Sequence, residues 1–349
     1  MPAPWMLPDF DDHEGVHIFR DADAGLTAII AIHSTHLGPA GGGTRFWHYA
    51  DPNAALTDAL RLSRGMSYKN AMAGLAMGGG KAVILADDRR SKTPELLAAF
   101  AHSVDSLGGR YVTAQDVGIS ADDVLAISKG TKFVSGLPPK EGGAGGDPGP
   151  STALGVYLGV RAAVQRALGR DDMAGVHVAI QGVGSVGGGL ARYLAAEGAR
   201  LTLADADAAR AAALAAELGG AAVDADAIMT VEADVFSPCA LGAILDAASI
   251  ARLNVPVVAG AANNQLARPE DGDRIQARGI LYAPDYVINA GGIINVALEY
   301  LEGAGRAAVE AKIKEIPARL ETIWAESAVT GDNPARVADR MAQKLIGRG

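Results

Sequence analysis

The sequence predicts an α/β protein with two domains, on the basis of three observations. The chain has 349 residues, whereas an ordinary single domain has about 100–200. From residue 151 onward, short apolar runs alternate with helical stretches, as expected for a parallel sheet whose strands are joined by helices. Between the halves lies EGGAGGDPGP at 141–150, which is too rich in glycine and proline to continue a helix or a central strand. We therefore expect a hinge there, and a cleft between the two domains.

The first half carries both strand and helix signals. Three apolar runs are predicted as strands, at residues 26–33, 81–85 and 111–114. Three helices are predicted, with N-terminal capping residues Asn53, Thr93 and Ser120. The second of these signals is the strongest, because Thr93 is followed by Pro94 and Glu95, which are favoured in a first helical turn.

The second half begins with a predicted helix from Ser151, followed by the apolar strands VHVAI and RLTLAD on either side of a helical stretch. The tail from about residue 305 to 346 reads as two helices separated by TGDNP at 330–334. The predicted domains are residues 1–145 for the first and 146–330 for the second, with 331–349 forming a C-terminal helix that packs back on the first domain.

Composition narrows the classes of protein that fit. The formal net charge of −9 argues against nucleic acid as a partner, because binding a phosphate backbone needs clustered lysine and arginine. The single cysteine, Cys239, cannot form an internal disulfide, which favours a reducing compartment. The chain begins MPAPWMLPDFDDHEG, unlike a signal peptide, and has no apolar run of membrane-spanning length. We expect a cytoplasmic protein with no membrane partner and, given the scattered histidines, no metal site.

A dinucleotide-binding motif is predicted in the second half. QGVGSVGGGL satisfies G-x-G-x-x-G, follows an apolar strand and opens a helical stretch. The expected pyrophosphate cradle consists of Gly182, Val183, Gly184, Ser185, Val186 and Gly187. Asp205, at the end of the second strand, would accept hydrogen bonds from the ribose and repel a 2′-phosphate, which favours NAD over NADP. A structural glycine-rich turn is the alternative, and Asp207 is the better candidate for a helix cap.

A second glycine-rich stretch, GLAMGGGKAVIL at 74–85, fails as a phosphate-binding loop. Leu75 stands where the first glycine of G-x-x-x-x-G-K-[ST] belongs, and Ala82 replaces the metal-binding hydroxyl. What remains is Lys81 at the head of a buried strand, with Lys69 upstream in SYKNA and Asp116 downstream in TAQDVG. Taken singly, such residues are usually solvated turn residues or helix caps. We interpret the glycines as small residues that let substrate and nicotinamide approach Lys81.

Motifs along most of the chain identify it as similar to the glutamate/leucine/phenylalanine/valine dehydrogenases. The resemblance rests on GPAGGGTRF, DALRLSRGMSYKNAMAGLAMGGGKAVI, VTAQDVGIS, DPGPSTALGV, QGVGSVG, FSPCALG, VAGAANNQL and YAPDYVINAGGIINVALEYL, in the family's order. It is closest to the leucine and phenylalanine branch. The resemblance implies an N-terminal substrate and dimerisation domain, a C-terminal Rossmann domain, and NAD(P)-linked oxidative deamination of an L-amino acid to the 2-oxo acid and ammonium. It also implies a homo-oligomer, to whose interface the first 25 residues could belong.

The resemblance also implies roles for individual residues. Lys81 would be the catalytic lysine, Asp116 its acid/base partner, and Lys69 the group that binds the substrate carboxylate. Asn263 would reach the substrate or the nicotinamide. Four further residues would contact the cofactor: Cys239, Ala240, Thr152 and Asp147. Arg45 and His48 are expected to be structural, with Arg45 paired to a carboxylate.

The predicted chemistry needs a base that works near neutral pH, because water must attack the iminium left after hydride transfer. A free lysine has a pKa of about 10.4 and is a poor base there. Burial and a neighbouring ammonium both disfavour the charged form, so Lys81 beside Lys69 is expected to have a lowered pKa.

The resemblance places the substrate side chain near Gly41 and Gly42. Glutamate-specific members carry a lysine at the position of Gly41, so a buried acid would find no cation there. Leucine-type members carry a large apolar residue, so Gly41 is expected to deepen the pocket. The other predicted walls are Ala114, Ile293 and Val296. We expect an apolar amino acid, leucine first, with phenylalanine or tryptophan as competitors. The alternatives from other classes are an inactive nucleotide-sensing protein and a different Rossmann enzyme.

Overall fold

The computed structural model describes residues 3–86, 92–138 and 143–348, so the first two residues of the predicted hinge stretch lie outside the described part. The chain divides into two compact units, and the predicted two-domain α/β class is confirmed. The first unit comprises residues 1–147, 293–309 and 342–349, and the second comprises 148–292 and 310–341. The prediction assigned residues 293–309 to the second domain, whereas in the structure they fold with the first unit.

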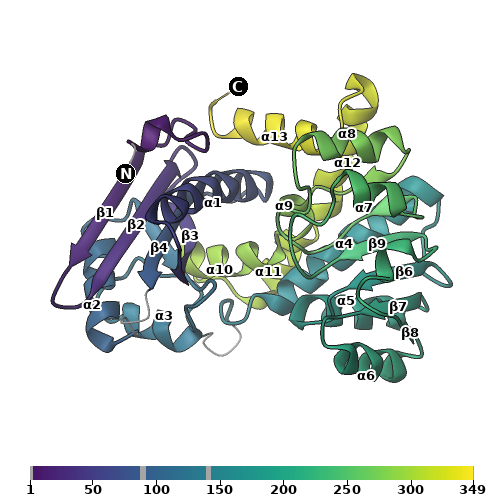
Figure 1. Cartoon of the computed structure of the whole chain (residues 1–349), viewed down its shortest axis with the longest axis horizontal. Helices are drawn as coiled ribbons and strands as arrows, with labels where there is room; N and C mark the ends of the chain where they lie inside the picture. The colour runs from purple at the N-terminus through teal and green to yellow at the C-terminus, as the bar shows by residue number, and fades with distance from the viewer. Residues whose placement is uncertain (1–2, 87–91, 139–142, 349) are drawn as a thin grey trace. The chain divides into compact units, whose positions relative to one another are not determined.

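The first unit is built on a five-stranded mixed sheet with the order β1-β2-β4-β3-β5 (Figure 1). Its strands are β1 Gly15–Asp21, β2 Leu26–Ser34, β3 Ala40–His48, β4 Gly78–Ala86 and β5 Tyr111–Ala114. The antiparallel pairs are β1 with β2 and β2 with β4, whereas β3 runs parallel to both β4 and β5. The three predicted strands are confirmed as β2, β4 and β5, whereas β1 and β3 were not predicted from the sequence.

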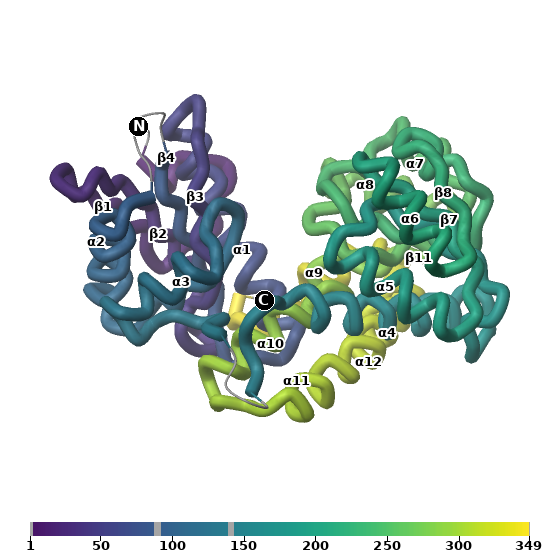
Figure 2. The backbone as a smooth tube through the Cα atoms, turned by 90° about the horizontal axis from the view of Figure 1, so that it is seen from below, coloured from purple at the N-terminus to yellow at the C-terminus, as the bar shows by residue number. Residues whose placement is uncertain are grey.

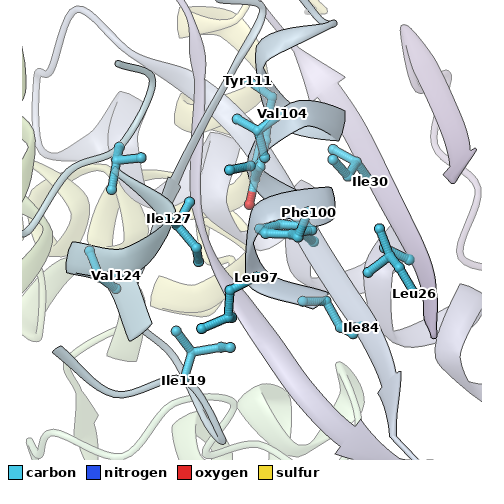
Figure 3. Packing of buried hydrophobic residues seen from close by; sticks show 14 of the residues in the cluster. Leu26, Ile30, Ile84, Leu97, Phe100, Val104, Tyr111, Ile119, Val124 and Ile127 are labelled. Carbon is cyan, nitrogen blue, oxygen red and sulfur yellow. The ribbon is translucent and has the colours of Figure 1, made fainter. Parts of the chain in front are cut away.

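Helices cover both faces of this sheet. They are α1 Pro52–Met72, α2 Pro94–Asp105 and α3 Ala121–Ile127, preceded by a short 3-10 turn at Pro4–Met6. In Figure 2, α2 and α3 lie on one side of the strands and α1 lies on the other. Figure 3 shows Phe100 and Val104 of α2 beside Ile30 and Tyr111 of the sheet, with Ile127 of α3 in the same buried cluster.

The helix caps agree with the sequence at two positions and differ at one. Thr93 and Ser120 accept hydrogen bonds from the backbone N–H groups of Leu96 and Asp123, as predicted. The cap of α1 is Asp51 and not Asn53, because the Asp51 carboxylate accepts the N–H of Asn53 at 2.9 Å and Pro52 occupies the first helical position.

The second unit is a parallel Rossmann-like sheet with the order β11-β10-β9-β6-β7-β8. Its strands are β6 His177–Gln181, β7 Arg200–Ala204, β8 Ala221–Ala222, β9 Val235–Pro238, β10 Val257–Val258 and β11 Leu281–Tyr282. Helix α4 Gly149–Leu168 precedes β6, and α9 Asp285–Ile288 follows β11. The helices between the strands are α5 Ser185–Ala196, α6 Ala208–Leu218, α7 Ala247–Arg252 and α8 Glu270–Ala277, with a 3-10 turn at Ile228–Thr230. In Figure 1, α5 and α6 lie on the opposite side of these strands from α7 and α8.

The rest of the chain contributes to both units. Its helices are α10 Gly291–Glu302, α11 Arg306–Ile313, α12 Ile316–Thr330 and α13 Pro334–Leu345. The stretch predicted as one helix before TGDNP is therefore two, with Pro317 in the first turn of the second. Within the first unit, Glu299 of α10 accepts the N–H of Gly136 at 2.8 Å, and Asn295 bonds Gly145 through both its amide atoms. These bonds hold α10 to the first unit.

The end of the chain also belongs to the first unit. The Gln343 amide donates to the Tyr68 hydroxyl at 3.1 Å, and the Arg348 guanidinium donates to the backbone oxygens of Asp12 and His33 at 2.7 and 2.8 Å. In the second unit, the earlier part of α13 is held by Asp339, which accepts from the Tyr286 hydroxyl. No helix in the described part of the chain combines the length and the apolar character needed to cross a membrane.

Candidate functional site

A lysine and an aspartate are paired inside the first unit. Lys81 belongs to β4, its side chain is only 7% exposed, and its Nζ donates to the carboxylate of Asp116. Asp116 follows β5 in a tight turn, where the N–H of Ile119 donates to the Asp116 carbonyl at 3.0 Å and Gly118 has a φ of 78°. Strand and turn thus bring together the two residues that were predicted to be catalytic.

The charges of this pair are set by burial and by their mutual attraction. Burial lowers the pKa of Lys81, and the attraction of Asp116 opposes that lowering. Burial alone would raise the pKa of Asp116, but the cations of Lys81 and Arg45 outweigh it and the pKa is lowered. The direction predicted for Lys81 is therefore confirmed. The guanidinium of Arg45 adds to the lowering of the pKa of Lys81, whereas the sequence analysis expected this of Lys69, which lies half-buried in the last turn of α1.

The glycines before Lys81 serve packing within the protein. A Cβ at Gly79 would lie 2.0 Å from the backbone nitrogen of Ser67 on α1, and one at Gly78 would lie 1.9 Å from the carbonyl oxygen of Ser34 on β2. A Cβ at Gly80 would lie 2.7 Å from the ring of Tyr111. Our interpretation that these glycines make room for substrate and nicotinamide was wrong, because protein atoms already occupy that space.

We expect Gly79→Ala to destabilise the protein by about 1–3 kcal/mol or more, because overpacking against backbone cannot relax by a change of rotamer. Equilibrium unfolding in guanidinium chloride measures this. The matched control is Gly65→Ala on the exposed side of α1, where a Cβ meets nothing within 4 Å. That variant should gain about 0.5–1 kcal/mol from helix propensity. Equal stabilities for the two variants would contradict the packing role.

A methionine fills the space beside Gly41. A Cβ at Gly41 would lie 2.3 Å from Sδ and 2.9 Å from Cγ of Met77, whose side chain is 1% exposed. The expectation that Gly41 deepens the pocket was therefore wrong, because the thioether takes the place of a residue-41 side chain. At Gly42 a Cβ would lie 1.9 Å from the carbonyl oxygen of Gly80, so this glycine allows a close backbone approach.

The three aliphatic residues predicted as pocket walls all lie in the same unit as Lys81. Ala114 ends β5 and is paired with Gly43 of β3. Ile293 and Val296 lie on the part of α10 that folds with the first unit, and Val296 faces Gly136, where an added Cβ would meet it at 3.4 Å. Their contact with substrate stays a prediction.

The glycine-rich loop of the second unit has the geometry of a dinucleotide cradle. Gly182 directly follows β6 with a φ of 89°, and a Cβ at Gly187 would lie 1.9 Å from the Gly182 carbonyl oxygen, so both positions require glycine. Gly184 is the N-cap of α5, has no side-chain cap, and an added Cβ there would meet nothing within 4 Å. The N–H groups of Ser185 and Val186 at this helix end thus suit a pyrophosphate. The N–H of Val183 instead donates to Asp205. The residues present fit a nicotinamide dinucleotide.

Asp205 holds this loop in place. Its Oδ2 accepts the N–H of Val183 at 2.8 Å, its Oδ1 accepts the N–H of Asp207 at 2.9 Å, and the guanidinium of Arg210 lies 3.5 Å away. Although burial would raise the pKa of Asp205, these backbone donors outweigh it and lower the pKa. Asp207 caps α6, as the sequence suggested, and also faces Arg210 at 3.4 Å.

Of the remaining predicted cofactor residues, two pack against the glycine-rich loop, and the other three belong to other segments of the chain. Cys239 and Ala240 follow β9 and pack against the loop: a Cβ at Gly187 would lie 3.1 Å from that of Cys239, and one at Gly182 would lie 2.7 Å from that of Ala240. Burial raises the pKa of the Cys239 thiol. Asn263 accepts the Asn289 amide at 2.8 Å, and Thr152 donates to the Pro148 carbonyl at 2.9 Å in the first turn of α4. Asp147 is assigned to the first unit, whereas the loop residues belong to the second.

Four residues with a place in these sites were missed or given other roles. Arg45 forms ion pairs with both Asp116 and Asp58. The Met77 side chain fills the space beside Gly41, and Arg210 forms an ion pair with Asp205. The glycine-rich sequence of β3 gives no signal that the Arg45 side chain lies beside Asp116. Across the described ranges, no group of histidine, cysteine, aspartate or glutamate side chains could hold a metal ion.

Comparisons with known proteins cover most of the chain. The family profile described as Glu/Leu/Phe/Val dehydrogenase, dimerisation domain, matches residues 13–133, and that of glutamate/leucine/phenylalanine/valine dehydrogenase matches 206–342. A leucine dehydrogenase from Geobacillus stearothermophilus is 48% identical over 96% of this chain and 91% of its own length. A valine dehydrogenase from Streptomyces albus is 47% identical over 97% and 93%. The crystal structure of L-tryptophan dehydrogenase from Nostoc punctiforme has a TM-score of 0.85, 41% identity and 96% coverage of both chains.

Proposed function

Because the chain belongs to the glutamate/leucine/phenylalanine/valine dehydrogenase family, we propose that it catalyses the reversible oxidative deamination of a branched-chain L-amino acid, leucine first. In the balanced reaction the L-amino acid, NAD⁺ and water give the 2-oxo acid, ammonium, NADH and a proton. The observation that carries the proposal is the buried ion pair of Lys81 and Asp116, a lysine of lowered pKa held by an ionised carboxylate. Such a pair suits proton transfer at a substrate nitrogen and at an attacking water.

NAD, when bound at the glycine-rich loop, supplies the hydride acceptor. The protein's own groups then have distinct tasks. Lys69 binds the substrate carboxylate as a cation. Lys81, in its neutral form, takes a proton at Nζ from the water that adds to the substrate imine. Asp116 stays ionised beside Lys81, stabilises the cationic substrate nitrogen and accepts the hydrogen bond of the protonated lysine. This division assigns Lys81 the base and Asp116 the electrostatic role.

The residues predicted to line the pocket support an aliphatic substrate. Gly41 provides no cation for a glutamate side chain, and the buried Met77 thioether shortens the space that Gly41 leaves open. Initial rates with Leu, Val, Ile, Phe, Trp and Glu, each with NAD, test the proposal. Leu, Val and Ile should give the highest kcat/KM. A preference for Glu, or no turnover with any of the six, would overturn the proposed function. A preference for Phe or Trp would overturn the branched-chain assignment in favour of an aromatic substrate.

We also propose NAD rather than NADP as the cofactor. Asp205 repels a 2′-phosphate, and the cation that faces it among the described residues, Arg210, is shared between Asp205 and Asp207 at 3.5 and 3.4 Å. Asp205→Asn should therefore reduce the ratio of kcat/KM for NAD over NADP on the order of tenfold, because one repelling charge is lost and Arg210 is freed. Asparagine keeps an oxygen for the Val183 N–H.

The control for this change is the double variant Asp205→Asn with Arg210→Ala. If Arg210 receives the 2′-phosphate once Asp205 is neutral, the double variant should lose most of the gained NADP activity. An Asp205→Asn enzyme with the wild-type cofactor ratio would contradict the proposed role of Asp205.

We further propose that the protein is a cytoplasmic homo-oligomer, on the support of the matched dimerisation domain and of the lone half-buried thiol of Cys239. Light scattering coupled to size exclusion tests the assembly, and a monomer at assay concentration would contradict it.

A further inference from the structure

A second cation, Arg45, lies beside the carboxylate of the Lys81–Asp116 pair. Arg45 lies on β3, and its Nε is 3.6 Å from Oδ2 of Asp116, the same oxygen that receives Lys81. This Nε is buried and has no hydrogen-bond partner among the described residues. A buried N–H without a partner costs free energy, so its position beside the carboxylate calls for a reason.

The guanidinium of Arg45 is itself anchored. Its Nη1 donates to Oδ2 of Asp58 on α1 at 2.6 Å, and the Tyr49 hydroxyl donates to the same oxygen at 2.6 Å. Arg61 donates to the other oxygen of Asp58 at 3.2 Å. The Arg45 and Asp58 side chains are 24% and 11% exposed, so this is a largely desolvated network and not a surface ion pair.

The proposed function, on which this inference rests, creates a charge problem at Asp116. Lys81 must pass through its neutral form to act as a base, and in that state Asp116 loses its first cation while it remains largely buried. A buried carboxylate without a cation takes up a proton. We propose that Arg45 is a positioning residue that keeps Asp116 ionised and in place while Lys81 is neutral, its free Nε–H closing onto the Asp116 carboxylate.

The charged groups around the pair indicate the direction of each effect. Arg45 lowers the pKa of Lys81, and Asp58 raises it, although burial is the largest cause of the shift. From β5, Tyr111 also faces Asp116, and its hydroxyl donates to the Gly42 carbonyl at 2.6 Å. Lys69 lies on α1 with Asp58 and Arg61. Removing Arg45 should therefore raise the pKa of Lys81, and removing the charge of Asp58 should lower it.

The experiment is a set of pH–rate profiles of leucine deamination with NAD. In Arg45→Met, the rising limb of kcat should move to higher pH by about one unit, because an opposing cation has been lost. In Asp58→Asn, the limb should move to lower pH. Arg45→Lys keeps the cation and should restore most of the wild-type profile. The matched control is Arg61→Met: this arginine is 54% exposed and forms its ion pair with Asp58 rather than with Asp116, so the limb should not move.

Opposite shifts in Arg45→Met and Asp58→Asn are a result that a purely structural network would not give. Circular-dichroism melting establishes that each variant is folded; if Arg45→Met is not, Arg45→Lys and Asp58→Asn carry the test. Variants that lose kcat with an unmoved limb, or limbs that move in the same direction, would overturn the inference. A wild-type enzyme without activity on the amino-acid panel would instead overturn the proposed function.

Discussion

Replacing Lys81 by alanine is expected to reduce kcat for oxidative deamination by about 10²–10⁴-fold, the usual contribution of a general base. The buried Nζ is bound to Asp116, and its lowered pKa makes the neutral amine available at lower pH than in free lysine. The wild-type rate should rise with pH as Lys81 loses its proton, and the residual activity of Lys81→Ala should lack that limb. Steady-state kinetics from pH 6 to 11 measure both effects.

A second lysine–aspartate pair in the same unit provides the matched control. Lys92 donates to Asp123 as Lys81 does to Asp116, but the Lys92 side chain is 29% exposed and its partner Asp123 belongs to the capping box of α3. Lys92→Met should leave kcat and the pH profile unchanged. Small primary amines added to Lys81→Ala should restore part of the rate by taking the place of the missing side chain. Near-wild-type turnover in Lys81→Ala would contradict the assigned role.

The strands could be predicted where burial makes them apolar, and not where packing demands small residues. β2 and β4 carry uninterrupted apolar runs, and both were found. β3 was missed because three consecutive glycines disfavour a strand by propensity. In the folded sheet those glycines are required, since added Cβ atoms at Gly42 and Gly43 would overlap the backbone of neighbouring segments. A tertiary requirement here overrides the local preference.

The functional residues divide in a similar way. Lys81, Asp116 and the glycine-rich loop at 182–187 stand in extended motifs, and the structure gives each an environment that suits its predicted role. Arg45 was assigned to a structural pair because nothing in the sequence reports that β3 and the turn after β5 place its Nε beside Asp116. The contact depends on how β3 and β5 are paired in the sheet, which the composition of either segment does not reveal.

The same limit applies to the pocket. Residues 41 and 77 are distant in the chain, and the parallel pairing of β3 with β4, which includes Ala40 with Gly78 and Gly41 with Gly79, brings their neighbourhoods together. From the sequence alone, Gly41 was therefore predicted to leave an empty space in the pocket. The structure shows one compensated pair, a small residue on β3 and a long flexible one just before β4. Substrate size cannot be inferred from residue 41 alone, because the Met77 side chain occupies the same space.

Removing this compensation should change the substrate preference. In Met77→Ala the thioether is lost while Gly41 remains, so the proposed pocket gains the volume of most of a methionine side chain. We expect the ratio of kcat/KM for Phe over Leu to rise by about 10–100-fold, the range that a few methylene groups contribute in an apolar pocket. Initial rates with both amino acids at saturating NAD measure the ratio.

Adding a side chain at residue 41 tests the same space from the other strand. Gly41→Leu alone should collide with Met77 and impair folding or leucine turnover, whereas Gly41→Leu in the Met77→Ala background should recover leucine preference, because the two changes occupy one volume. Met173→Ala, which removes an equally buried methionine from the second unit, is the control for loss of stability without a change of the ratio. An unchanged Phe/Leu ratio in Met77→Ala would show that the Met77 side chain lies outside the pocket, and additive effects in the double variant would show that residues 41 and 77 do not share it.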